Sequence, residues 1–193
     1  MNDSDGSFAF VAGVPDDVTV GRTQTGDELE VVLQGISVLM NWRLARSIAA
    51  TVFAMTWQDL REYELEVRPR ELSYVLKDKV SGVIDEYHWP STTQISSGEP
   101  VVIGPGTIAF EPLPVRLAFP QSLSIWGRST DSWRICSGRR EPGEIILGLR
   151  HRKDVHLDGT LTIDLDLGMA VRLDTPMESY HYENVEPLYD QGA

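Results

Sequence analysis

Proline and glycine divide the second half of the chain into short apolar runs, and this pattern limits the possible folds more than any other feature. Short β-favouring runs separated by such turn residues are typical of a β-sandwich or a β-barrel. The runs are residues 101–103, 107–110, 115–119, 123–126, 133–136, 145–150, 154–157, 160–167 and 170–173. We therefore expect residues 96–176 to form an antiparallel β-barrel or sandwich.

The clearest single strand lies in residues 160–167. Leu161, Ile163 and Leu165 alternate there with threonine and aspartate. Because successive side chains of a strand point to opposite faces, one face should be buried and the other hydrated. The Asp158-Gly159 pair just before it is the strongest hairpin-turn signal in the chain, so we place a tight turn at these two residues.

The first half of the chain, residues 1–95, has a mixed pattern. Its expected elements are a strand at 27–34, a helix at 41–60, a half-exposed strand at 63–67 and a helix at 70–87. Both helices are predicted from apolar residues that recur every three or four positions. A strand inside the first helical segment is the alternative, because Thr51, Val52 and Phe53 favour β-structure.

These patterns together predict an α+β fold. A mixed N-terminal region with two helices should precede the barrel or sandwich. An acidic tail at 177–193 should follow it, and the whole chain should form one folding unit.

The charge of the chain is strongly acidic. Its 17 Lys and Arg residues against 29 Asp and Glu residues give a formal net charge of −12. Such a chain repels phosphate backbones, so extended nucleic-acid binding is not expected. The single cysteine, Cys136, excludes an internal disulfide and a cysteine zinc cluster. We expect a buried structural thiol there.

The N-terminal sequence and the most apolar stretch both bear on targeting. The first ten residues contain acidic but no basic groups, which argues against a secretory signal. The apolar stretch at 36–57 contains Arg43 and Arg46, whose charges would be costly in a bilayer, so we expect a core segment and no membrane span. These features predict a cytoplasmic or other intracellular protein.

No phosphate-loop, dinucleotide-binding, zinc-protease or nucleophile-elbow motif occurs in the sequence. Two groups of side chains could hold a cation but fit hydrated strand and hairpin surfaces better, so no metal site is assigned. The first group is His151, Asp154, His156 and Asp158, and the second is Asp164 and Asp166. No catalytic residue or cofactor is assigned, and Mg²⁺ is expected only if the chain hydrolyses nucleotides.

A basic stretch stands out within the acidic chain. Residues 128–153 hold seven cations and three acids, which gives this segment a net charge of +4. Arginine with neighbouring hydroxyl groups provides the donors that a phosphate needs. The candidate phosphate-binding residues are Arg128, Ser129, Thr130 and Arg134. The alternative is that these cations pair with acidic residues elsewhere in the chain.

Several short motifs follow one another in a familiar order. They are Pro105-Gly106, Phe119-Pro120, Gly127-Arg128-Ser129-Thr130, Pro142-Gly143 and Gly168-Met169. In this order and spacing, residues 98–173 resemble the trimeric dUTPase and dCTP deaminase superfamily. The resemblance implies that Arg128, Ser129 and Thr130 bind phosphate in a turn, and that the chain forms a homo-oligomer.

The catalytic carboxylates of that superfamily have no counterparts at the matching positions. Gly148 stands where the deaminase glutamate is expected, and residues 139–142 contain no aspartate. The resemblance therefore implies a nucleotide- or phosphate-binding protein without the full catalytic set.

Two other functions are left open. One is a non-enzymatic β-sandwich module for assembly or protein interaction, of viral or phage origin, supported by candidate exposed aromatic residues. These are Trp126, Trp133, Tyr180, Tyr182 and Tyr189. The other is an active nucleotide hydrolase that uses Asp131, Glu141 or Asp85.

Overall fold

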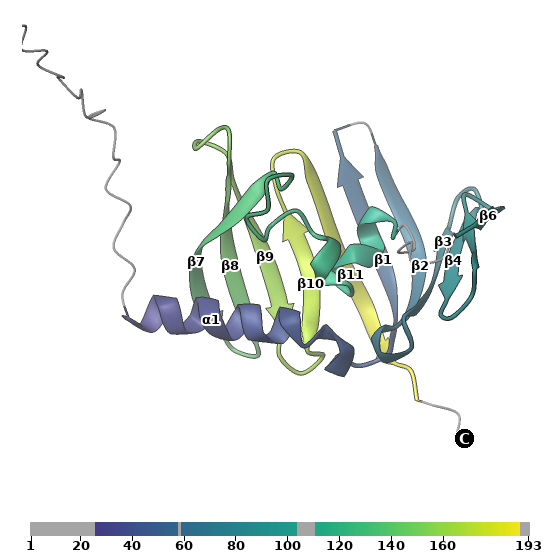
Figure 1. Cartoon of the computed structure of the whole chain (residues 1–193), viewed down its shortest axis with the longest axis horizontal. Helices are drawn as coiled ribbons and strands as arrows, with labels where there is room; N and C mark the ends of the chain where they lie inside the picture. The colour runs from purple at the N-terminus through teal and green to yellow at the C-terminus, as the bar shows by residue number, and fades with distance from the viewer. Residues whose placement is uncertain (1–25, 58, 104–110, 190–193) are drawn as a thin grey trace, which may run out of the picture.

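The computed structural model describes residues 26–57, 59–103 and 111–189, and these form one long antiparallel sheet with a helix across it (Figure 1). The eleven strands have the order β6-β5-β4-β3-β2-β1-β11-β10-β9-β8-β7. The strands are β1 (Ile48–Thr56), β2 (Leu60–Arg68), β3 (Ser73–Asp78), β4 (Ile84–His88), β5 (Thr93–Ser96), β6 (Glu99–Val102), β7 (Trp133–Glu141), β8 (Glu144–His151), β9 (Asp158–Asp164), β10 (Met169–Asp174) and β11 (Glu178–Pro187). The helices are α1 (Gly26–Met40) and the 3₁₀ turns η1 (Trp42–Leu44), η2 (Pro69–Glu71), η3 (Leu113–Leu117) and η4 (Pro120–Ser122).

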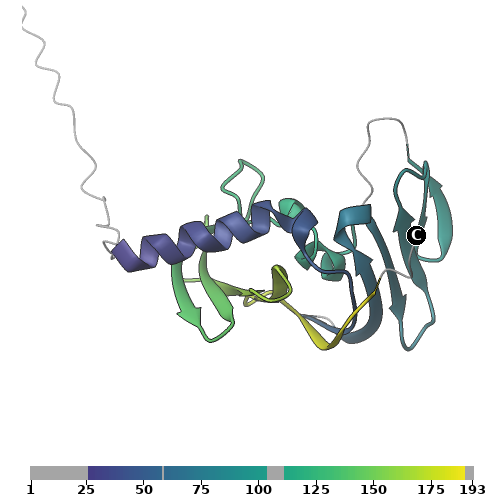
Figure 2. The same cartoon turned by 90° about the horizontal axis from the view of Figure 1, so that it is seen from below.

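The sheet consists of two meanders that meet at its centre. β1 pairs with β11, so the first and last strands lie side by side, and β6 and β7 form the two edges. Figure 2 shows that the sheet is curved and that α1 and the segment with η3 and η4 lie on its concave side. The described residues 111–132, which precede β7, therefore lie on the concave face.

The core lies between this concave face and the elements that cross it. On β1, Ile48, Ala50 and Val52 are buried and alternate with less buried residues. β8 has the same alternation, with Ile145, Leu147 and Leu149 fully buried. Alternation of this kind buries one face of each strand and leaves the other to solvent.

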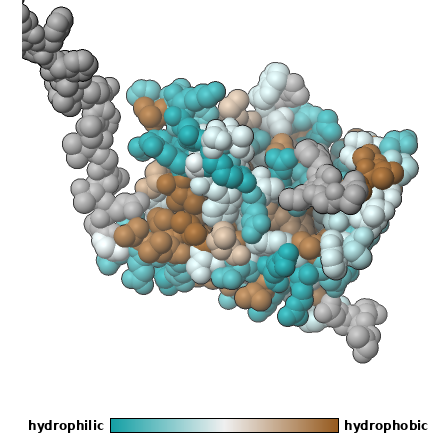
Figure 3. All heavy atoms as spheres, in the orientation of Figure 1, coloured by the Kyte–Doolittle hydropathy of each residue, from teal (hydrophilic) through white to brown (hydrophobic). Residues whose placement is uncertain are grey.

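Residues 27–34 belong to helix α1, so the predicted strand there is wrong. The alternating Leu29 and Leu33 that suggested a strand are 48% and 57% exposed. Figure 3 shows an apolar area in the region of α1. The buried residues are Val32, Gly35 and Leu39, which recur at helical spacing over a longer window. A Cβ on Gly35 would lie 3.0 Å from Leu147, so the helix approaches the sheet closely.

Both predicted helices at 41–60 and 70–87 are also wrong. The first segment contains η1 and β1, and its β-branched residues favoured the strand that was the alternative. The second contains β3 and β4, which pair with each other across a turn. In that turn Gly82 has φ +71°, and the Asp78 carboxylate accepts hydrogen bonds from the Val80 and Ser81 amides at 2.9 and 2.7 Å.

The predicted α+β fold with two helices and a closed barrel or sandwich is therefore wrong. The described residues contain a single α-helix and a single sheet whose two edges do not meet. The strands expected at 63–67, 133–136, 145–150 and 170–173 are confirmed. Residues 115–119 instead include η3, and the run at 107–110 lies outside the described residues. The segment read as an acidic tail contains β11, at the centre of the sheet.

The β8–β9 hairpin forms, but its turn does not lie at Asp158-Gly159. Both residues belong to β9, and Arg150 pairs with Asp158 in the ladder. Gly159 is needed because a Cβ there would lie 2.7 Å from the main-chain oxygen of Asp174. The glycine reflects a close approach of two backbone segments and not a turn conformation.

Replacing Gly159 with alanine should therefore destabilise the protein. We expect the free energy of unfolding to fall by about 1–3 kcal/mol, because a main-chain contact cannot move aside like a flexible side chain. Urea denaturation would measure the change. Gly26→Ala is the matched control, since nothing lies within 4 Å of a Cβ at that position. Equal stability of the two variants would contradict this explanation of Gly159.

Candidate functional site

Arg128, the first predicted phosphate ligand, has its donors engaged within its own loop. Its guanidinium Nη2 lies 2.9 Å from Oδ1 of Asp131, and its main-chain amide donates to Oδ2 at 2.9 Å. Nη1 and Nη2 also donate to the main-chain oxygens of Gln121 and Leu123, at 3.0 and 2.6 Å. The side chain of Arg128 thus connects η4 to the turn before β7.

Asp131 is the buried partner in this arrangement. Its side chain is 1% exposed, whereas that of Arg128 is 50% exposed. Burial by itself would raise the pKa of Asp131, but the hydrogen bonds and charge of Arg128 lower it below its ordinary value. We refer to Arg128 and Asp131 together as the loop clasp. The ion pair between these two residues agrees with the alternative for the basic stretch, that its cations pair with acidic residues of the same chain.

The other predicted phosphate ligands lie beside the loop clasp on the surface. Ser129 and Thr130 are exposed in the turn, and Arg134 is exposed on β7. Arg152 donates to the main-chain oxygen of Arg128 and strengthens the turn. Contact of Ser129, Thr130 or Arg134 with an anion stays a prediction.

The candidate metal ligands and carboxylates also lie in local surface structure. The His151 ring accepts a hydrogen bond from the Asp154 amide at 3.1 Å, and Asp158 pairs with Arg150 at 3.1 Å. Within the described residues no three histidine, cysteine or acidic side chains form a group that could hold a metal. Cys136 is partly buried, with Sγ 3.4 Å from the Gly148 oxygen.

The carboxylates considered for hydrolysis belong to separate elements. Asp131 is in the loop clasp, while Asp85 on β4 accepts from the Ser97 amide at 2.7 Å. Glu141 at the end of β7 pairs with Arg139 at 3.3 Å.

The most distinctive hollow is a groove of about 930 Å³ between the end of α1, the β3–β4 hairpin and the η3–η4 segment. We call it the aromatic groove, because six aromatic side chains line it. These are Trp42, Tyr74, Tyr87, Trp89, Phe119 and Trp126. A volume of this size is typical of ligand sites in proteins.

Three buried rings form the base of the aromatic groove. The ring of Trp42 meets that of Phe119 edge to face at 5.2 Å between centroids. Tyr74 lies 6.4 Å from Phe119 and receives a hydrogen bond on its hydroxyl oxygen from Gln94 at 2.8 Å. Edge-to-face and tilted contacts at these distances are favourable, so the base is a rigid aromatic surface.

The rim combines exposed aromatic and charged groups. Trp89 is 61% exposed, and the Arg43 guanidinium lies over the Trp42 ring at 5.4 Å. Trp126 is fixed by its indole N–H, which donates to the Pro120 oxygen at 2.8 Å. Burial raises the pKa of Glu111, which is the one carboxyl group among the described lining residues.

Leu72 enters the groove from an unfavourable backbone conformation. Its φ of 53° and ψ of 45° lie in the left-handed region, which costs a leucine about 1–2 kcal/mol. Such strain persists where the surrounding structure holds the residue in place, and it is frequent at binding sites. The strain marks this part of the molecule independently of its aromatic content.

Sequence reasoning missed the aromatic groove. Of the aromatic residues expected on the surface, Trp133, Tyr180 and Tyr182 are buried, and Tyr189 is 86% exposed. Trp126 is half-buried in the groove. The other aromatic lining residues come from the predicted helices at 41–60 and 70–87, from the run at 115–119, and in the case of Trp89 from no predicted element. No linear pattern connects them. Their common location depends on the crossing of η3 and η4 over the sheet.

No protein-family model matches this chain, and no curated protein matches it. A search of solved structures found MucB, with 14% identity and a TM-score of 0.46 over 83% of this chain and 60% of that one. The MucA/MucB complex of Pseudomonas aeruginosa matches with 16% identity and a TM-score of 0.45, over 82% and 59% of the two chains. LprF from Mycobacterium bovis matches with 13% identity and a TM-score of 0.41, over 85% and 97%. The chain thus spans about 60% of the MucB length.

Two expectations are corrected at this point. The nucleotide- or phosphate-binding protein of dUTPase-like fold is wrong, because the sheet is open and the donors of Arg128 are engaged in the loop clasp. The expected cytoplasmic or other intracellular placement is withdrawn, since none of the matching structures above supports it. In the described part of the chain, no helix has the length and apolarity needed to span a membrane. The motif resemblance in 98–173 stays a prediction.

Proposed function

We propose that the protein is a binding module that holds an apolar segment of a partner protein in the aromatic groove. The observation that carries this proposal is the composition of the groove, which joins tryptophan, tyrosine and arginine in one hollow. These three residue types dominate the energetically important positions of protein interfaces. A groove of this kind fits a protein-interaction role better than a nucleotide site.

The arrangement of the lining residues fits an apolar segment. The base is buried and rigid, so little conformational entropy is lost on binding there. Trp89 on the rim is exposed and can close over a bound side chain. Glu111 is the one carboxyl side chain among the described lining residues. General acid–base catalysis commonly uses two titratable groups, one as the acid and one as the base.

A displayed library of random peptides, selected against the purified protein, would test the proposal. We expect peptides rich in aromatic or aliphatic residues to be enriched. Trp89→Ala should weaken an enriched peptide about 30-fold in fluorescence polarisation, because truncating an interface hot spot costs about 2 kcal/mol or more. Trp57→Ala is the matched control, since Trp57 is 80% exposed and does not line the groove.

Two results would overturn the proposal. One is a library that yields no peptide above the background of an unrelated protein. The other is an enriched peptide that binds Trp89→Ala as tightly as the original protein. If N-phenylnaphthylamine binds the groove while no peptide does, the ligand is a small apolar molecule and the protein-interaction proposal fails.

A further inference from the structure

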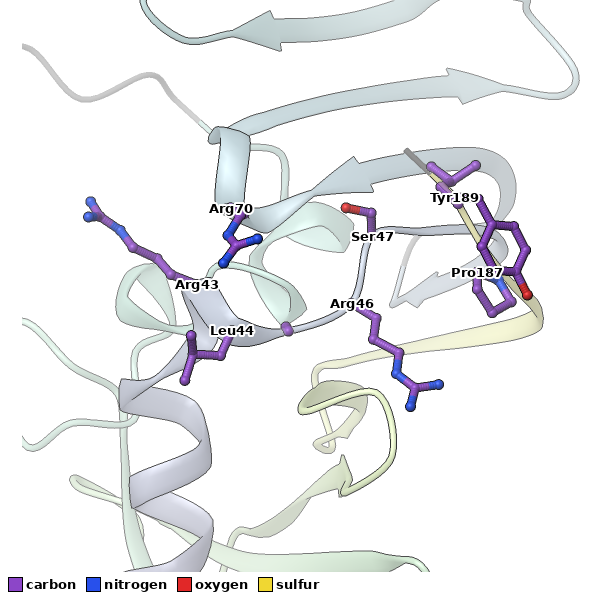
Figure 4. Close-up of a pocket in the computed structure, with 9 residues that line it drawn as sticks. Arg43, Leu44, Arg46, Ser47, Arg70, Pro187 and Tyr189 are labelled. Atoms are coloured by element: carbon purple, nitrogen blue, oxygen red, sulfur yellow. The ribbon is translucent and has the colours of Figure 1, made fainter. Parts of the chain in front are cut away.

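A second hollow lies next to the aromatic groove and has a different character. Its volume is about 390 Å³, and its lining includes Arg43, Arg46 and Arg70 together with Ser47 and Tyr189. Figure 4 shows Arg43 and Arg46 extending from the segment between α1 and β1, and Arg70 extending from η2. We call it the arginine pocket. Arg43 also lines the aromatic groove, so the two hollows share this lining residue.

Among the described residues, the arginines of this pocket lack the counter-ions that many other arginines have. Most described arginine side chains form an ion pair with a carboxylate or donate a hydrogen bond to another oxygen atom. Arg61 pairs with Asp59 in this way, and Arg172 pairs with Asp174. Within residues 26–57, 59–103 and 111–189, Arg46 and Arg70 have no ion pair or side-chain hydrogen bond. No described acidic residue lines the pocket. In a chain of net charge −12, such a local excess of positive charge is unusual.

The directions of the three side chains indicate what kind of anion fits. In Figure 4 the guanidinium groups of Arg43, Arg46 and Arg70 point in different directions and do not converge. A single compact phosphate is held best by donors that converge on it. Separated cations fit several carboxylates spaced along a chain. The apolar and aromatic part of the lining, which includes Leu44 and Tyr189, fits a peptide as well.

We infer that the arginine pocket binds acidic residues of the same partner segment whose apolar residues occupy the aromatic groove. This inference rests on the proposed function and adds a charge requirement to it. The partner segment should carry a cluster of Asp or Glu next to its apolar residues. The shared lining residue Arg43 favours this arrangement, because one extended segment can contact both hollows on either side of it.

Binding of hexa-aspartate, which has no apolar side chains, would test the arginine pocket alone. In NMR titrations at about 0.1 M salt, we expect saturable shifts of the Nε–H signals of Arg43, Arg46 and Arg70, and no shift for Arg134. Affinity should fall about tenfold in Arg46→Glu/Arg70→Glu, because two favourable charge contacts become repulsive. Lys153→Glu is the control, since it makes the same kind of change at an exposed cation outside both hollows.

Three outcomes would overturn the inference. They are no shift with hexa-aspartate, equal loss of affinity in Lys153→Glu, and tighter binding of oligothymidylate than of hexa-aspartate. If Arg46→Glu/Arg70→Glu unfolds, Arg46→Gln/Arg70→Gln gives the same comparison without introducing acidic side chains. The groove test measures how Trp89→Ala changes the binding of peptides enriched from a random library, so its failure is distinguishable from failure of the hexa-aspartate test. If hexa-aspartate binds but Trp89→Ala has no effect on selected peptides, the pocket stands and the proposed function does not.

Discussion

Replacing Trp42 with alanine should lower the free energy of unfolding by about 3–5 kcal/mol, the usual loss when a large aromatic residue in a core is truncated. Trp42 is 7% exposed and packs edge to face on Phe119. It also supports Arg43, whose guanidinium lies over the indole. The substitution therefore removes a core side chain that is also one of the three rings at the base of the aromatic groove.

Urea denaturation followed by circular dichroism would measure this loss, with Trp89→Ala as the matched control. Both substitutions remove a tryptophan from the same groove, but Trp89 is 61% exposed. Truncating an exposed residue usually changes stability by about 0.5 kcal/mol or less. We expect both variants to bind an enriched peptide more weakly, and the Trp42 variant alone to unfold more easily. A Trp42 variant as stable as the Trp89 variant would contradict the assigned packing.

Trp42 also illustrates what sequence patterns could not show. In the sequence it fits the apolar face of a helix over 41–60, but the chain forms only the short turn η1 there before β1 begins. Its aromatic partner, Phe119, lies far along the chain in a run that looked like a strand. The two rings meet because the η3–η4 segment crosses the concave face. A contact of this kind depends on tertiary structure and leaves no local periodicity.

Local alternation, by contrast, was sufficient for several strands. Alternation at 63–67 predicts β2, and alternation in 160–167 predicts the greater part of β9, since a half-buried strand imposes a period of two. The error at 70–87 has a physical cause. Tyr74 and Leu76 are buried on β3, and the turn at Gly82 shifts the register before β4 begins. Two short strands separated by such a turn can place apolar residues at spacings of three and four.

The second large effect concerns Arg128, which sequence reasoning assigned to an anion. We expect Arg128→Ala to lower the free energy of unfolding by about 3 kcal/mol at neutral pH. Removing one member of a buried ion pair costs about 3–5 kcal/mol of stability. We expect the lower end of this range, because the Arg128 side chain is half-exposed to solvent. The loss arises because Asp131 would remain buried without its cation.

This loss should depend on pH with a definite sign. Arg128 holds the pKa of Asp131 below its ordinary value of 3.8 in the folded protein. A carboxyl group with a lowered folded pKa contributes stability that is fully present above its unfolded pKa, and loses that contribution as the pH falls through the folded pKa. The stability difference between the original protein and Arg128→Ala should therefore be full at neutral pH and shrink in acid.

Thermal unfolding of both proteins across this pH range would measure the difference directly. Asp78 and Asp174 also have lowered pKa values, so acid weakens both proteins, and the informative quantity is the gap between them. Asp131→Asn should show a gap that is likewise reduced in acid, while Arg134→Ala should match the original protein throughout. If Arg128→Ala keeps full stability, the loop clasp contributes nothing to folding, and the donors of Arg128 are available to a ligand after all.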